Sequence, residues 1–164
     1  MDHPMITALR GFIAGALGVI GMAGVSFTMR RMVEPNKMIG TTHYEKVVEK
    51  TRSTLQPDAE PFDKETQIRI GEVGHLAFGG LWGVVFAFAM KNNNIKPLVH
   101  GVAFGTAIWA LAFGGYMPVL GISRGIKDMD AYEASRTLLC HATYASVMAL
   151  LLEEMRNPRR KILL

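Results

Sequence analysis

Three histidines interrupt long uncharged stretches of this 164-residue sequence: His75, His100 and His141. Imidazole is the side chain whose charge ordinarily changes near neutral pH, and its neutral form also binds metal ions. An ionisable group within an apolar helix is costly to bury, so it is a functional candidate by default. The three positions therefore indicate proton-dependent chemistry or ligand binding.

Spacing distinguishes two of these histidines from the third. Each of the two begins a stripe of small residues at intervals of four, which a helix places on one face: His75, Gly79 and Gly83, and His141, Ala145 and Ala149. If the uncharged stretches are successive membrane spans, the second and fourth enter from the same side. We therefore expect His75 and His141 to lie at similar depth and to point inward. His100 enters from the opposite side and is expected to lie apart from them.

Polar residues near the same end extend this pair into a candidate cluster: Glu72, His75, Glu133, Arg136, His141 and Tyr144. One hypothesis is a proton-responsive site in which the two carboxylates tune the imidazoles. A second is axial ligation of haem or (bacterio)chlorophyll by His75 and His141, with the adjacent small residues leaving room for the ring. A third is that each imidazole is neutral and only hydrogen-bonded to a backbone carbonyl or to Tyr144.

Catalytic chemistry finds little support in the sequence. Glu72 and His75 form a Glu-x-x-His step of the kind that binds metal in carboxylate di-iron bundles, but no second step follows, so we assign no metal site. The sequence contains no nucleophile-base-orienter set, no phosphate-binding loop and no zinc-ligand spacing. It predicts a protein that is not an enzyme.

Four uncharged stretches must position these residues. They run from Gly11 to Met29, Val73 to Met90, Pro97 to Ser123 and Thr137 to Leu152, and contain 19, 18, 27 and 16 residues. A helix needs roughly 20 residues to cross a bilayer, and helices of soluble proteins usually carry a charged face. The sequence predicts an all-α, four-transmembrane-helix bundle that forms a single integral membrane domain over residues 1–164, with spans at about 7–30, 71–91, 97–120 and 135–154. The alternative is four buried helices of a soluble domain.

The long first loop, at about residues 31–70, is expected to lie outside the membrane. Thr42 with Glu45 fits a capping box, and the residues that follow predict a short amphipathic helix with one apolar face, formed by Tyr44, Val47, Val48 and Thr51. We expect this helix either to lie on the membrane surface or to pack against the bundle in water. Asp63 is expected to cap a helical lead into the second span.

Small residues four positions apart recur in every span. Such pairs permit the close backbone approach through which helices associate in lipid. The set comprises Gly11, Gly15, Gly79, Gly83, Gly101, Gly105, Ala145 and Ala149. It predicts tight packing within the bundle, against a second copy of the chain, or against another membrane subunit. Pro118 is expected to bend or end the third helix.

The net charge of +4 does not indicate nucleic-acid binding, because the basic residues are divided over both ends of every span and form no stripe. The expected partner is the lipid bilayer. The numbers of Lys and Arg on the two sides of the membrane are ambiguous about where the termini lie. Their total on each side favours one orientation, and their density in short segments favours the opposite one. We expect cytoplasmic termini, because anionic lipid attracts a basic tail just beyond the membrane, formed by Arg156, Arg159, Arg160 and Lys161.

The second half of the sequence keeps four motifs in a fixed order: His75-Leu-Ala-Phe, Tyr116-Met-Pro-Val-Leu-Gly-Ile, Tyr132-Glu133, and His141 before Glu153-Glu154-Met-Arg156-Asn157. Together with Val33-Glu34-Pro35 after the first span, this order resembles the YagU-like family of small bacterial inner-membrane proteins. The likeness covers most of the chain apart from residues 36–70. The sequence departs from the family in two places. After the first span, where the family tends to have a Pro-Pro-Arg element, this sequence has Pro35 and Lys37. Late in the third span, where the family tends to have a histidine, it has the segment from Phe113 to Gly115.

The resemblance implies a four-span protein of the bacterial inner membrane with a link to acid tolerance. We therefore expect a non-enzymatic, pH-responsive or permeation-related helical bundle centred on His75 and His141. The alternative is an accessory or structural subunit of a larger membrane complex, one that holds haem or pigment through the same two histidines. In either case we expect assembly with further copies of the chain or with other membrane subunits.

Overall fold

The computed structural model of the protein describes residues 3–33, 42–91, 95–123 and 125–156. Within these ranges the chain is helical and contains no strand, which confirms the all-α prediction. The long helices are α1 (Pro4–Val33), α3 (Lys64–Ala89), α4 (Pro97–Leu111) and α6 (Ala131–Arg156), and α2 (Thr42–Leu55) is the short helix of the first loop. A π-helical turn, η1 (Ala112–Tyr116), and α5 (Met117–Val119) continue α4, and a 3-10 turn, η2 (Ile126–Asp128), precedes α6.

Four of these segments are long and apolar enough to cross a membrane: Pro4–Val33, Lys64–Ala89, Pro97–Val119 and Ala131–Arg156. Large apolar side chains are exposed on each of them, and examples are Leu9, Leu81, Leu111 and Leu139. An exposed apolar surface of this extent is unusual for a soluble monomer, whereas hydrocarbon chains solvate it well. The protein is therefore a helical, multi-pass membrane protein with the predicted four spans.

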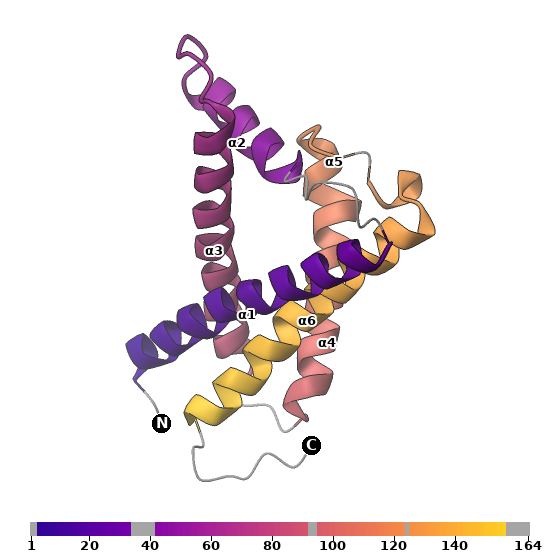
Figure 1. The fold of residues 1–164 in the computed structure, drawn as a ribbon. Coiled ribbons are helices and arrows are strands. Elements are labelled where there is room, and N and C mark those ends of the chain that lie inside the picture. Colours follow the sequence, from indigo (N-terminus) through magenta and orange to yellow (C-terminus); the bar gives the residue numbers. More distant parts are fainter. Residues whose placement is uncertain (1–2, 34–41, 92–94, 124, 157–164) are drawn as a thin grey trace.

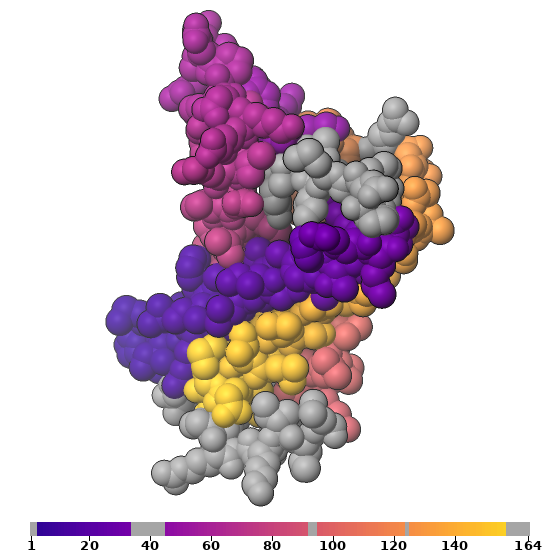
Figure 2. All heavy atoms as spheres, in the orientation of Figure 1, coloured from indigo at the N-terminus to yellow at the C-terminus, as the bar shows by residue number. Residues whose placement is uncertain are grey.

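The helices are not all parallel to one another (Figure 1). α1 crosses obliquely and contacts both α3 and α6, while α4 packs along α6. α3 and α6 begin at the upper side of the view, and α1 and α4 begin at the lower side. Toward the upper side, α3 diverges from the segment formed by η1 and α5, and α2 lies across between them. In the space-filling view α2 and the first half of α3 project from the rest of the molecule (Figure 2).

α3 begins at Lys64, so the helical segment predicted to start after Asp63 is continuous with the second span, which was predicted from about residue 71. The added turns carry charged residues such as Glu65 and Arg69, which form an exposed ion pair. Asp63 begins the helix, as predicted, by accepting a hydrogen bond from the backbone N–H of Thr66 at 3.0 Å. This cap satisfies an N–H group that has no partner within the helix.

Replacement of Asp63 by alanine is expected to lower the free energy of unfolding, and the loss is expected to depend on pH. Hydrogen bonds from the Thr66 hydroxyl and backbone N–H lower the pKa of Asp63 below its ordinary value of 3.8. A lowered pKa stabilises the fold above the ordinary value, and this contribution is lost as the pH falls through the lowered pKa. Unfolding curves of wild type and Asp63→Ala should therefore converge in acid. Asp58→Ala, an exposed control in the preceding turn, should match wild type throughout.

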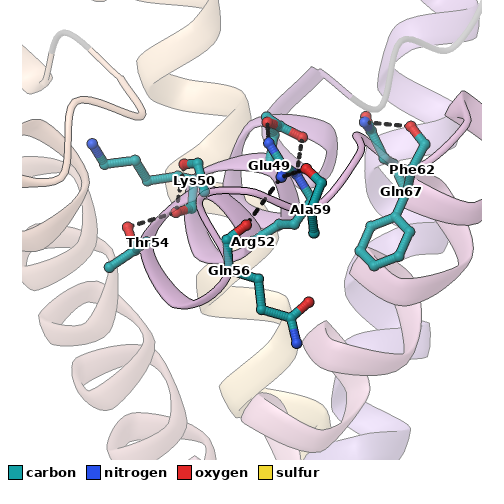
Figure 3. Close-up of polar contacts among 9 residues, drawn as sticks. Glu49, Lys50, Arg52, Thr54, Gln56, Ala59, Phe62 and Gln67 are labelled. Atoms are coloured by element: carbon teal, nitrogen blue, oxygen red, sulfur yellow. Dashed lines mark hydrogen bonds and ion pairs between the residues drawn. The ribbon is translucent and has the colours of Figure 1, made fainter.

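Arg52 fixes the turn that joins α2 to α3 (Figure 3). Its guanidinium binds the carboxylate of Glu49, one turn earlier on α2, and it donates to the carbonyl oxygen atoms of Gln56 and Ala59. The hydrogen bond from Arg52 lowers the pKa of Glu49, so this pair stays charged near neutral pH. The side chain of one residue thus satisfies carbonyl groups beyond the end of α2, where no helical donor reaches them.

α2 packs against α3 rather than standing away from it. Val48 is buried on α2, and Glu45 lies 3.9 Å from the ammonium group of Lys64 at the start of α3. These contacts agree with the expectation that the amphipathic helix packs against the bundle. The predicted capping contact of Thr42, the side chain of Tyr44 and the basic tail at residues 159–161 lie outside the described part of the protein.

The third span changes its helical form just before Pro118. The π turn η1 separates α4 from α5, and Pro118 is the second residue of α5. Proline lacks an N–H group and its ring collides with the preceding turn of a regular helix, so a wider turn accommodates it. The helix then ends at Val119, and Gly121, two residues beyond, adopts a left-handed conformation with φ of 69°. Pro118 therefore distorts the end of the third span, as the sequence predicted.

Candidate functional site

Glycines bring the backbones of α1 and α3 into contact. A Cβ atom added to Gly11 would lie 2.6 Å from the carbonyl oxygen of Gly83, and one added to Gly15 would collide with the carbonyl oxygen of Gly79. Only a hydrogen atom fits at these positions, so larger residues would separate the helices. Close contact of this kind supplies the van der Waals energy that holds helices together in lipid. It fixes α3, and with it His75, against α1.

A second backbone contact joins α4 to α6. A Cβ atom on Gly101 would lie 2.7 Å from the carbonyl oxygen of Ala145, and one on Gly105 would collide with the carbonyl oxygen of His141. Ala145 and Ala149 are almost completely buried on α6. The position of His141 therefore depends directly on how closely α4 approaches its backbone.

Tyr144 of α6 joins three helices. Its hydroxyl group donates to the carbonyl oxygen of Gly79 on α3 at 2.7 Å. Its backbone lies against α1, since a Cβ atom on Gly18 would be 2.6 Å from the Tyr144 carbonyl oxygen. A buried hydroxyl group needs such a partner, and this bond sets the separation of α3 and α6 about one turn from His75 and from His141.

His75 of α3 and His141 of α6 both lie about one turn from the hydrogen bond by which Tyr144 joins their helices. Both are half-buried, and a charge on His141 acts on His75. The Nδ1–H group of His141 donates to the carbonyl oxygen of Thr137 at 2.8 Å. Because a carbonyl oxygen can only accept, this bond gives neutral His141 the tautomer with its lone pair on Nε2. The ring of His141 is thus fixed in orientation beside its partner on α3.

Aromatic rings lie around this pair. Phe113 of η1 meets the ring of His141 edge to face, with the ring centroids 5.8 Å apart. Phe78, three residues after His75 on α3, packs on Tyr116 of η1 with a centroid separation of 6.5 Å. The π turn therefore supplies rings to both α3 and α6. Such surroundings solvate charge poorly, so a proton taken up by either imidazole has a large electrostatic effect.

The other residues of the predicted cluster do not converge on the histidine pair in one group. Arg136 donates to the hydroxyl oxygen of Ser26 on α1 at 3.2 Å. Glu133 is half-buried in the first turn of α6, and Glu72 is exposed on α3. Neither carboxylate forms an ion pair within the described ranges. His100 lies in the first turn of α4, which begins at the opposite side of the bundle from α3 and α6.

Sequence reasoning did not find two residues at the site, Phe113 and Thr137. The buried hydroxyl group of Thr137 accepts a hydrogen bond from Nε1 of Trp109 at 2.9 Å, and its carbonyl group orients His141. The spacing of four residues between Thr137 and His141 was the available signal. Helical periodicity gave no signal for Phe113, because the π turn changes the helical period on which a face is predicted.

Metal-ligating groups are sparse in the part of the chain that the structure describes. There, no three side chains of His, Cys, Asp or Glu come together as a set that could hold a metal ion. Comparison of the chain with protein-family models, with curated proteins and with solved structures finds no match. Function must therefore be inferred from the histidine pair and the helices that hold it.

Proposed function

We propose that the protein is a non-enzymatic, multi-pass protein of the bacterial inner membrane, similar to the YagU-like proteins, whose bundle responds to pH through His75 and His141. The observation that carries this proposal is the hydrogen bond from Tyr144 to Gly79, which joins the two histidine-bearing helices about one turn from His75 and from His141, within range for the charge of His141 to act on His75. Four spans put both termini on one side of the membrane, which we assign to the cytoplasm. The lipid bilayer is the partner, and self-assembly through further small-residue contacts is part of the proposal.

The physical basis is repulsion between like charges in apolar surroundings. Two neutral imidazoles can lie beside each other without electrostatic cost, whereas two imidazolium ions repel and are poorly solvated. The titratable groups nearest the pair in the packed elements include Glu72 of α3, Tyr116 of η1, Arg30 of α1, and Glu133, Arg136, Cys140 and Tyr144 of α6. Glu72 is exposed, so water screens its charge. Arg136 carries a positive charge, as a protonated histidine does, and therefore does not stabilise the imidazolium ions.

Acid should therefore weaken the contact between α3 and α6. The contact is complete at a pH where both imidazoles are neutral, and it loosens as the pH falls through the range in which they take up protons. Tyr144 holds the same two helices together through the carbonyl oxygen of Gly79, so the loosening is expected to be local. Proton or ion permeation along the loosened contact is the proposed outcome.

A distance measurement between α3 and α6 tests this proposal. Val73 of α3 and Leu139 of α6 are 66% and 48% exposed and flank the histidines, so cysteines placed there in a Cys140→Ala background can carry spin labels. In liposomes the label separation is expected to lengthen and broaden when the pH is lowered in steps from about 7.5 to about 4, the range over which both imidazoles take up protons. His75→Gln and His141→Gln should each make the change smaller, because a single imidazolium ion is still poorly solvated but has no second imidazolium ion to repel.

His100→Gln is the matched control, since this histidine lies in the first turn of α4 and outside the pair. It should respond to acid as wild type does, and proton flux into the same liposomes should follow the label distances. A label separation that is the same throughout this pH range contradicts the proposal. So does an acid response that persists when both histidines are replaced.

The bond between His141 and Thr137 favours one second candidate function, an accessory subunit of a larger membrane complex. A histidine that binds metal through Nε2 usually donates its other N–H to a carbonyl or carboxylate group, as His141 donates at 2.8 Å. His75 and His141 would then be axial ligands of haem or (bacterio)chlorophyll. A Soret band in purified protein that is lost in His75→Ala and His141→Ala supports this function, and a colourless preparation contradicts it.

A further inference from the structure

Basic residues gather where α1 ends and α6 begins, on the side of the bundle where α3 also begins. Arg30 and Arg31 are in the last turn of α1, and Arg136 is in the second turn of α6. Arg30 and Arg136 are both half-buried, and both lie near enough to the thiol of Cys140 for their charges to act on it. Two guanidinium groups from two helices therefore lie around one small region of the surface.

Arg136 is held at this place but is not neutralised by the protein. Its Nη1 donates to the hydroxyl oxygen of Ser26 at 3.2 Å, and within the described ranges it forms no ion pair. A guanidinium group has five N–H donors, so one hydroxyl oxygen leaves most of them available. A charged group in a membrane span is costly unless an anion or several acceptors accompany it.

Arg156, at the other end of α6, shows how a guanidinium group of this helix can be satisfied by protein. It donates to the carbonyl oxygen atoms of Met90 and Lys91, at 3.1 and 3.0 Å, and so caps the end of α3. Arg136 has no comparable pair of backbone acceptors in the described part of the chain. The two arginines therefore differ in what they require from the surroundings.

We propose that Arg136, with Ser26 and Arg30, binds the phosphate group of an anionic phospholipid. A guanidinium group forms paired hydrogen bonds to phosphate oxygen atoms, and a second cation nearby favours an anionic over a zwitterionic headgroup. Arg136 is near the start of its span, which is the depth of the headgroups. The same two helices carry exposed apolar side chains that can contact the acyl chains: Ile20 and Phe27 on α1, and Leu139 on α6.

Thermal unfolding of delipidated protein in detergent tests this site. Added phosphatidylglycerol is expected to raise the unfolding temperature more than phosphatidylcholine with the same acyl chains. Arg136→Gln should weaken the apparent affinity for phosphatidylglycerol about tenfold, the effect of losing one charge-assisted pair of hydrogen bonds. Arg69→Gln removes an equal charge from an exposed position on α3 and should leave the affinity unchanged.

Arg136→Lys is the second variant. It keeps the positive charge, so it can test the site even if Arg136→Gln does not fold. It loses the planar pair of donors, and it should bind phosphatidylglycerol several-fold more weakly than wild type. Equal stabilisation by the two lipids overturns the proposal, as does an effect of Arg69→Gln as large as that of Arg136→Gln. Full stabilisation by inorganic phosphate alone also overturns it, since the ligand would then be a free anion rather than a lipid.

Discussion

Gly83→Ala is expected to lower the free energy of unfolding by about 3 kcal/mol or more, which is the upper part of the range for overpacked sites. The new Cβ atom would collide with the carbonyl oxygen of Gly11 and would lie 2.8 Å from the Cα atom of Gly15. Both are backbone atoms, which cannot turn away as the end of a side chain can. The helices α1 and α3 must separate to admit the methyl group, and the contact that fixes α3 is lost.

Gly74→Ala is the matched control for this prediction. It lies on the same helix, and a Cβ atom there would have no heavy atom within 4 Å. We expect its free energy of unfolding to match that of wild type or to rise by up to about 1 kcal/mol, because alanine favours a helix over glycine. Unfolding of both variants in a mild detergent, followed by tryptophan fluorescence, measures the difference. Equal stability of Gly83→Ala and Gly74→Ala would contradict the packing of α1 on α3.

Gly105→Ala is expected to have a comparable effect on stability and a second effect on the response to acid. Its Cβ atom would collide with the carbonyl oxygen of His141 and would lie 2.9 Å from the Cα atom of Ala142. Relief of this overlap moves α6 away from α4 at the position of the histidine. His141 is then displaced relative to His75. The free energy of unfolding is expected to fall by about 1–3 kcal/mol or more, the cost of overpacking a close contact.

Two measurements on one protein separate these effects. The free energy of unfolding reports the packing of α4 on α6, and the label separation between α3 and α6 reports the acid response. Gly115→Ala, in η1, is the control, because a Cβ atom there would contact nothing within 4 Å. If Gly105→Ala unfolds like wild type and keeps its acid response, α4 does not position His141 as described.

The parts of the fold that could be predicted from the sequence are those fixed by local chemistry or by length. The four spans were predictable because a charge-free stretch of bilayer length is rare outside membrane helices. The cap at Asp63 was predictable because it involves only the first turn of its own helix. The direction in which α1 crosses the other helices could not be predicted. Every span carries small-residue pairs, and the sequence does not say which pair of one helix packs against which pair of another. The contact of Gly11 and Gly15 with Gly79 and Gly83 is a property of the assembled bundle.

The candidate site could also be predicted in part: the packed face of α3 that carries His75 was predicted, and the position of Glu72 relative to it was not. The interval of four residues from His75 to Gly79 correctly related the histidine to a packed face of α3, and Tyr144 joins the two histidine-bearing helices by a hydrogen bond. His75 is only half-buried, so it lies near the edge of the packed face. Glu72 is three residues earlier, and three residues turn a helix by about 300°, so its side chain is displaced by about 60° from that of His75. Glu72 therefore falls beyond the edge of the packed face and is exposed. That outcome depends on where the neighbouring helices end their contact.

We expect lipid to surround the four helices, and extraction of membranes without detergent distinguishes lipid from water as their solvent. Cells expressing the chain are ruptured, the membranes are washed with alkaline carbonate, and the suspension is centrifuged at high speed. The protein should sediment with the membranes and should be released only by detergent. Recovery of folded protein in the detergent-free supernatant would contradict a lipid environment, because the exposed apolar faces of α1, α3, α4 and α6 would then be facing water.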